Sequence, residues 1–144
     1  MVKILFVCHG NICRSPMAEF VMKDLVAKAG RSKEFEIASA AVSREELGND
    51  LYPPAKRVLK ERGVAFAPRQ ARLVSSADLA YYDRIYYMDS RNLNYLRSLF
   101  GNGAEKCQPL LPRDVADPYY SGDFAQTCED ILTGCRRILE ECTC

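Results

Sequence analysis

Residues 4–16 read Ile-Leu-Phe-Val-Cys-His-Gly-Asn-Ile-Cys-Arg-Ser-Pro. The first four residues form a short, continuous apolar run of the kind found in a buried parallel strand. The last residue, Pro16, suits the first turn of a helix, where its missing N–H costs nothing. The segment between them therefore predicts a loop from the end of a strand to the start of a helix. Free backbone N–H groups and the positive end of the helix dipole favour an anion there.

Cys8 and Arg14 stand at the two ends of this loop and have side chains suited to binding and attacking a phosphate. Only the thiolate of cysteine is a good nucleophile, and a helix N-terminus with a nearby arginine lowers a cysteine's pKa. The planar guanidinium of Arg14 can bind two phosphate oxygens. Gly10 allows a backbone conformation closed to other residues, and Asn11 tolerates a left-handed one. We expect Ser15 to cap the helix and to donate a hydrogen bond to the departing Cys8 sulfur.

Strand-like and helix-like segments alternate along the rest of the chain. Apolar and aromatic runs predict strands over residues 2–7, 35–39, 83–88 and 107–111. Helical spacing and capping signals predict helices over residues 15–29, 53–62, 90–100 and 121–141, with a weak helical turn near 75–79. This alternation predicts one α/β domain, residues 1–144, in three layers: a four-stranded parallel sheet with helices on both faces. Ligands bind such sheets at the carboxyl ends of the strands, where the Cys8 loop begins.

Composition and charge argue against several classes of partner. Lys plus Arg is 20 and Asp plus Glu is 19, and a net charge of +1 argues against nucleic acid. No apolar run approaches the length of a membrane span, so we expect no membrane partner. The N-terminal Met-Val-Lys leads into a predicted strand rather than a signal sequence, so we expect a cytoplasmic protein.

The seven cysteines do not have the spacing of a metal site or a disulfide framework. Cys128, Cys135 and Cys142 lie seven residues apart on an apolar helical stripe, which predicts core packing for the first two. Cys142 and Cys144 are close to the C-terminus, where exposure is expected. Cys107 has no evident partner. No Cys-X-X-Cys pair is present, so we expect neither a metal nor a cofactor.

Two motifs resemble those of a known family. Cys-X-Gly-Asn-Ile-Cys-Arg-Ser-Pro-Met-Ala-Glu, from Cys8, is similar to the phosphate loop of the low-molecular-weight protein tyrosine phosphatases. Asp117-Pro118-Tyr119-Tyr120 is similar to the acid loop of that family, and the likeness extends from end to end. The resemblance implies a phosphotyrosine phosphatase I-like fold and hydrolysis of protein phosphotyrosine, or of small aryl phosphates, through a phosphocysteine on Cys8. It also implies a phosphotyrosine-bearing protein as partner and phosphate or vanadate as inhibitor.

Asp117 is the general acid and base that the resemblance implies. One carboxylic acid can protonate the leaving group and later deprotonate the attacking water. Tyr119 and Tyr120 are expected to wall the entrance. Asp114 and Asp89 are the competing carboxylates, and Asp89 is expected to cap its helix or to brace the loop.

Other loop residues receive supporting or substrate-binding roles from the same resemblance. Asn11 and Ser39 are similar to a family pair whose side chains hydrogen-bond and hold the loop in shape. His9 is expected at the rim, where it touches substrate rather than acting as a base. Together with it, the expected substrate-binding residues are Gly10, Asn11, Ile12, Cys13, Tyr119 and Tyr120. Cys13 is also a candidate redox partner, because a sulfenic acid on Cys8 could condense with its thiol.

The sequence departs from the family pattern at two places. Many members have a histidine where this chain has Pro68, so Glu19 must find another partner or solvent. Many members also have an aromatic wall residue where this chain has Glu45, and the wall is either missing or supplied by Tyr52. These departures bear on substrate preference.

Three alternatives are weighed against this interpretation. The related arsenate reductases need two further cysteines between about residues 75 and 95, and this chain has none there. Protein arginine phosphatases have a threonine where Ile12 stands and lack the tyrosine pair. A phosphate-binding module without turnover would not need the intact set of Cys8, Arg14, Ser15 and Asp117.

Overall fold

The computed structural model describes residues 1–142. Its sheet has the strand order β2-β1-β3-β4, and every neighbouring pair is parallel. The strands are β1 (Val2–Cys8), β2 (Phe35–Ala41), β3 (Arg84–Tyr87) and β4 (Cys107–Pro109). The four predicted strands and their parallel arrangement are confirmed.

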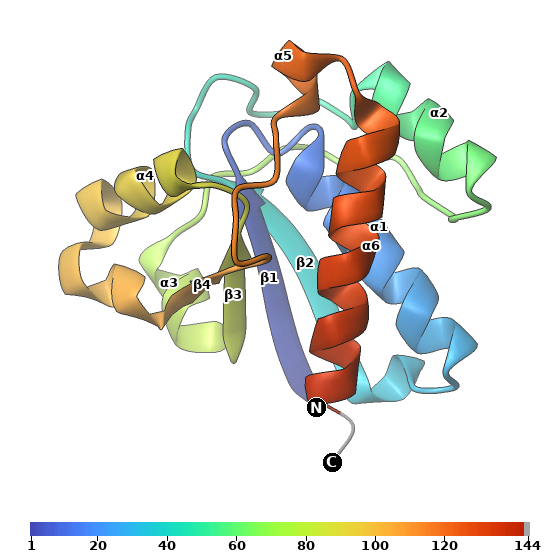
Figure 1. Ribbon diagram of the computed structural model, residues 1–144. Coiled ribbons are helices and arrows are strands. Elements are labelled where there is room, and N and C mark those ends of the chain that lie inside the picture. Colours follow the sequence, from blue (N-terminus) through green and yellow to red (C-terminus); the bar gives the residue numbers. More distant parts are fainter. Residues whose placement is uncertain (143–144) are drawn as a thin grey trace.

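Helices cover both faces of the sheet, as Figure 1 shows. The α-helices are α1 (Arg14–Lys28), α2 (Pro53–Glu61), α3 (Ser76–Tyr81), α4 (Ser90–Phe100), α5 (Pro118–Ser121) and α6 (Phe124–Glu141). Two 3₁₀ helices, η1 (Ser32–Glu34) and η2 (Gly101–Lys106), precede β2 and β4. Helices α1, α2 and α6 pack on one face of the sheet, and α3 and α4 pack on the other. The predicted three-layer α/β fold is therefore confirmed.

The apolar run of β1 is explained by its position in the middle of the sheet. Ile4 and Phe6 pack into the core under α1 and α6, whereas Leu5 and Val7 pack into the core under α3 and α4. All four side chains are completely buried. A strand covered on both faces has no polar side, which is why it lacks alternation.

The carboxyl end of β1 is the topological switch point of the sheet. The chain leaves β1 toward β2 on one side, whereas β3, the neighbour on the other side, connects away from β1 to β4. The loop after β1 lies at this end, and α5 and the start of α2 lie at the same end in Figure 1. This is where ligands bind in open α/β sheets.

Some predicted boundaries differ from the structure. The last helix begins at Phe124, not at residue 121, because Gly122 (φ 76°) ends the short helix α5 and Asp123 caps α6. The fourth strand ends at Pro109 rather than at residue 111, although the Leu110 N–H still donates to the Tyr87 carbonyl at 2.9 Å. The first helix begins at Arg14, so Ser15 lies inside it and does not cap it.

The predicted core cysteines are confirmed, since Cys128 and Cys135 are buried on α6. Cys107 is also buried, and Cys142 is half-buried. Cys144 lies outside the described residues. Within residues 1–142, no helix is both long enough and apolar enough to cross a membrane, and no group of three or more potential ligand side chains could hold a metal ion.

Candidate active site

A cavity opens beside the loop that follows β1. The loop contributes six of the sequence-predicted site residues, and three more come from the segment before and within α5. The sequence-predicted residues that line it are Cys8, His9, Gly10, Ile12, Cys13, Arg14, Asp117, Tyr119 and Tyr120. Asn11, Ser15 and Ser39 are buried and do not line this cavity.

The Cys8 sulfur contacts the first turn of α1. Sγ is 3.0 Å from the Ser15 hydroxyl, and the Ser15 backbone N–H donates to it at 3.4 Å. The hydroxyl and the backbone N–H of Ser15 can both stabilise negative charge on the sulfur. The positive N-terminal end of α1 can do the same. Ser15 therefore has the predicted contact with sulfur but not the predicted capping role.

The Arg14 guanidinium is buried and held by two carboxylates, those of Asp89 and Asp117. Nη1 donates to Asp89 Oδ2 at 2.6 Å and to the Val115 carbonyl at 2.8 Å, and Nη2 lies 3.4 Å from Asp117 Oδ2. Burial by itself lowers the pKa of Arg14, but the negative groups of Cys8, Asp89 and Asp117 outweigh it, so the net pKa is raised. Arg14 is therefore a permanent cation aimed at the cavity.

Asn11 is the only non-glycine residue with a positive φ among residues 1–142, at 59°. Its Nδ2 donates to Ser15 Oγ at 2.8 Å and to Ser39 Oγ at 2.9 Å, which confirms the predicted contact with Ser39. Gly10 has no positive φ. A Cβ at this position would come within 3.1 Å of Glu46 Cγ, so the Glu46 side chain would have to shift by a few tenths of an ångström to admit one.

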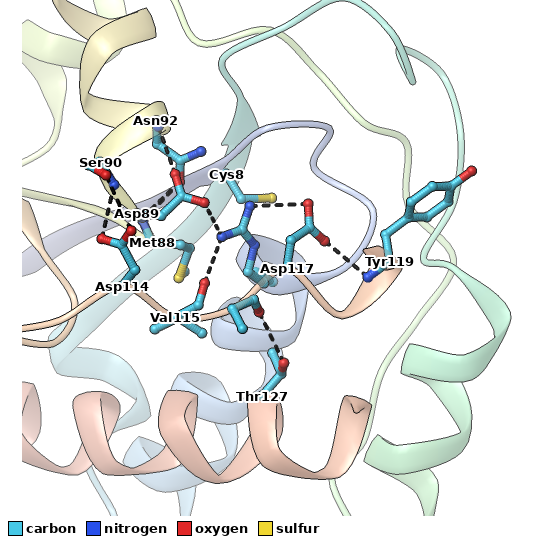
Figure 2. Close-up of polar contacts among 12 residues, drawn as sticks. Cys8, Met88, Asp89, Ser90, Asn92, Asp114, Val115, Asp117, Tyr119 and Thr127 are labelled. Atoms are coloured by element: carbon cyan, nitrogen blue, oxygen red, sulfur yellow. Dashed lines mark hydrogen bonds and ion pairs between the residues drawn. The ribbon is translucent and has the colours of Figure 1, made fainter. Parts of the chain in front are cut away.

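Asp117 presents its carboxylate to the cavity from the start of α5. Its Oδ1 accepts the Tyr119 backbone N–H at 3.1 Å, which caps the helix, and its other oxygen faces Arg14. Asp114 does not line the cavity; its carboxylate accepts from the N–H and hydroxyl of Ser90 (Figure 2). Asp89 caps α4 and braces Arg14, as expected. The geometry therefore favours Asp117 over both competitors.

The segment before Asp117 is anchored to α6 by residues that the sequence analysis missed. Arg113 makes a two-pronged contact with Asp130, at 3.1 and 2.9 Å, and Thr127 Oγ1 donates to the Ala116 carbonyl at 3.2 Å. Figure 2 shows the contact of Thr127 as a dashed line. A charged residue on the otherwise apolar face of the predicted helix was the available signal, since Asp130 is buried.

Aromatic rings flank one side of the entrance. Tyr119 and Tyr120 are 54% and 75% exposed and contact each other edge to face at 5.3 Å. Tyr52 does not line the cavity; it packs behind Tyr119 at 5.5 Å between ring centroids. The ring of Tyr52 therefore supports the wall without forming it.

The position of the missing aromatic wall is acidic. Glu45 and Glu46 line the cavity there. Glu45 is held by His9, whose Nε2 is 2.8 Å from its carboxylate, and the His9 ring contacts Tyr95 at 5.3 Å. This places His9 at the rim, away from a base position next to sulfur.

Two remaining predictions concern Cys13 and Glu19. Cys13 is buried, and burial followed by the negative charges of Cys8 and Asp117 raises its pKa well above the usual range. Its thiol therefore stays protonated at neutral pH. Glu19 does find another partner: it accepts from Ser39 Oγ at 2.7 Å and from Lys23 Nζ at 2.6 Å.

Comparisons with known proteins agree with this geometry. Residues 3–143 match the family described as low molecular weight phosphotyrosine protein phosphatase. The chain is 40% identical to the low molecular weight protein-tyrosine-phosphatase YfkJ of Bacillus subtilis, over 96% of this chain and 94% of that protein. The YfkJ crystal structure superposes with a TM-score of 0.93 at 39% identity, covering 98% of this chain and 94% of that one.

Two further solved structures are informative. The low molecular weight protein tyrosine phosphatase SP-PTP of Streptococcus pyogenes has a TM-score of 0.91 at 34% identity, covering 98% of this chain and 93% of that one. DARP, a drosophila arginine phosphatase, has a TM-score of 0.88 at 31% identity, covering 99% of both chains. The same fold thus occurs in structures named for either phosphoamino acid.

The fold and the site together define an α/β phosphatase built around an anion-binding loop. The chain belongs to the low molecular weight phosphotyrosine protein phosphatase family. It is accordingly an enzyme that hydrolyses protein phosphotyrosine.

Proposed function

We propose that this phosphatase acts through a phosphocysteine on Cys8, with Asp117 as general acid and base and Arg14 as the phosphate-binding cation. One observation carries the proposal: the Cys8 sulfur, the Arg14 guanidinium and the Asp117 carboxylate meet in a single cavity. Arg14 uses both hydrogens of Nη1 on Asp89 and Val115 and one of Nη2 on Asp117, which leaves Nε and the second hydrogen of Nη2 for phosphate oxygens. The guanidinium is therefore pre-oriented for a two-point contact.

The reaction then proceeds in two displacements. The Cys8 thiolate attacks phosphorus, and the bond to the tyrosyl oxygen breaks while Asp117 gives that oxygen its proton. Water next attacks the phosphocysteine, Asp117 takes the proton from that water, and inorganic phosphate leaves from Cys8. The Ser15 hydroxyl, 3.0 Å from Sγ, stabilises the sulfur as it leaves. No step needs a metal or cofactor.

The proposed substrate is a phosphotyrosine-bearing protein, with phosphate and vanadate as inhibitors. The exposed rings of Tyr119 and Tyr120 beside Asp117 support a planar aryl ester. Ile12 lines the cavity and offers an apolar contact to the aryl ring. Phosphoarginine is the second candidate because of the structural likeness to the drosophila arginine phosphatase.

We also propose a cytoplasmic location. The mechanism requires the Cys8 thiol to be free, and all six cysteines among residues 1–142 are unpaired. Free thiols persist in reducing compartments.

Turnover of para-nitrophenyl phosphate by wild-type and Cys8→Ser proteins tests the mechanism. The Cys8→Ser variant should lose turnover yet still bind phosphate or vanadate, because Arg14 and the loop N–H groups remain. EDTA should leave the wild-type rate unchanged. Loss of activity with EDTA, restored by a divalent metal, would rule out the thiolate mechanism. A Cys8→Ser protein with wild-type turnover would do the same.

A further inference from the structure

Asn11 uses every hydrogen bond that its side chain can make. Its Nδ2 donates to the hydroxyls of Ser15 and Ser39. Its Oδ1 accepts from Arg69 Nη2 and, at 3.2 Å, from the backbone N–H of Arg72. An amide side chain has two N–H donors and one oxygen with two lone pairs, so Asn11 has no capacity left. The amide can point either way only if its partners allow it. A partner that can only donate must face Oδ1, so such partners fix the orientation of the Asn11 amide.

Arg69 is the side chain that sets this orientation, together with the backbone N–H of Arg72. A guanidinium has no acceptor, so it holds Oδ1 of Asn11 and turns Nδ2 toward the hydroxyls. Ser15 Oγ then accepts from Asn11, and its own hydrogen is free for the Cys8 sulfur at 3.0 Å. The Ala40 carbonyl, the other acceptor near that hydroxyl, is farther away at 3.4 Å. A chain of hydrogen bonds thus runs from Arg69 through Asn11 and Ser15 to the Cys8 sulfur. A hydrogen bond donated to a thiolate stabilises its negative charge.

The Arg69 guanidinium also brings a positive charge next to Asn11. Within the described part of the chain, it makes no ion pair, whereas Arg14 contacts both Asp89 and Asp117. Burial lowers the pKa of Arg69, and the negative groups of Glu19, Asp50 and Cys8, in that order, oppose this fall. A cation near a thiol favours the thiolate.

Backbone contacts fix the place of Arg69. Its N–H donates to Asp50 Oδ1 at 3.2 Å, and its Nη1 donates to the Asn49 carbonyl at 3.3 Å. Pro68 before it restricts the chain to an extended entry. The segment around Pro68 is the one that lacks the histidine found in many family members. Arg69 is the side chain from this segment that contacts Asn11 in the loop after β1.

We propose that Arg69 is a positioning residue for the nucleophile: it orients the Asn11 amide so that Ser15 donates to Cys8, and it stabilises the thiolate. The inference rests on the proposed role of Cys8.

The test is the pH dependence of Cys8 alkylation by iodoacetamide, with the modified residue identified by mass spectrometry. Alkylation follows the thiolate and needs no turnover. Arg69→Met should lower the rate of Cys8 alkylation at neutral pH about tenfold, because the thiolate loses a stabilising donor and cation. Arg69→Lys keeps the charge and a donor, and it should restore most of the wild-type profile. Arg57→Met removes an exposed cation on α2 and is the matched control.

The outcomes separate this inference from the proposed function. An unchanged alkylation profile in Arg69→Met overturns the inference, even if kcat or thermal stability falls. A profile in Arg57→Met that shifts equally also overturns it, because the effect would then be net charge alone. If Arg69→Met does not fold, the same criterion applies to Arg69→Gln, which keeps a donor without the charge. An active Cys8→Ser protein would instead contradict the proposed mechanism.

Discussion

Arg14 Nη1 donates to Asp89 Oδ2 at 2.6 Å, and both side chains are largely shielded from solvent. The same Asp89 carboxylate accepts the Asn92 backbone N–H at 2.8 Å and so caps α4. One carboxylate therefore ties the start of a helix on one face of the sheet to the cation of the phosphate site. It also occupies Nη1, so that the rest of the guanidinium faces the cavity.

Replacing Asp89 should separate these two roles. Asn keeps the capping oxygen but loses the charge, so Asp89→Asn should lower kcat/KM for para-nitrophenyl phosphate about tenfold with little change in stability. Asp89→Ala also loses the cap and should cost about 1–2 kcal/mol in denaturant unfolding. Asp114→Asn is the control, because Asp114 binds only the Ser90 end of α4. Equal losses in the Asp89 and Asp114 variants would show that Asp89 acts only on the helix.

Asp117→Asn should slow poor leaving groups most. The amide can still cap α5 but cannot transfer a proton, so phenyl phosphate should suffer more than para-nitrophenyl phosphate. The measurement is kcat over a series of aryl phosphates of rising leaving-group pKa. Wild-type rates on phenyl phosphate would mean that another group is the acid.

Peroxide should inactivate the enzyme reversibly through a Cys8–Cys13 disulfide. The Cys8 thiolate is oxidised to a sulfenic acid, and the Cys13 thiol displaces water from it to form the S–S bond. Cys13→Ser should keep most basal activity but recover poorly after dithiothreitol. The raised pKa of Cys13 predicts that disulfide formation is slow at neutral pH and faster as pH rises. Peptide mapping that finds only Cys8 joined to Cys142 would contradict this prediction.

Ile12 should contribute to the choice between phosphoamino acids. We expect matched phosphotyrosine peptides to be hydrolysed at least about 100-fold better than phosphoarginine ones, a difference of about 2.7 kcal/mol in transition-state binding. Ile12→Thr should narrow this gap, because a hydroxyl can bond a phosphoguanidinium. Equal kcat/KM values for the two wild-type substrates would move the assignment to arginine phosphatase.

The anchor of the acid loop predicts a pH-dependent stability. The hydrogen bonds from Arg113 lower the pKa of Asp130 in the folded protein. The pair therefore stabilises the fold above the unfolded pKa of about 3.9, and this stabilisation is lost as pH falls through the folded value. Asp130→Asn should lower Tm at neutral pH, and the difference from wild type should shrink in acid. A difference that stays constant down to acid pH would show that the charge of Asp130 does not contribute.

Local patterns predicted most of the fold. The apolar run ending at Val7 predicted a doubly buried strand, and helical spacing predicted α1, α2, α4 and most of α6. These inferences succeed because they depend on neighbours in the chain: side-chain periodicity, caps and the backbone limits of proline and glycine. The start of the last helix was predicted wrongly because a single residue, Gly122, ends α5 just before it.

The sequence by itself was enough to predict the proposed chemistry, since Cys8, Arg14 and Ser15 are within one loop and its adjoining helix turn. What holds that loop was decided only by the tertiary structure. Asp89 reaches Arg14 across 75 residues, and Arg69 reaches Asn11 across 58. Such contacts depend on how separate elements pack at one end of the sheet. No local periodicity or spacing encodes them, because the residues meet only after the core under both faces of β1 has formed.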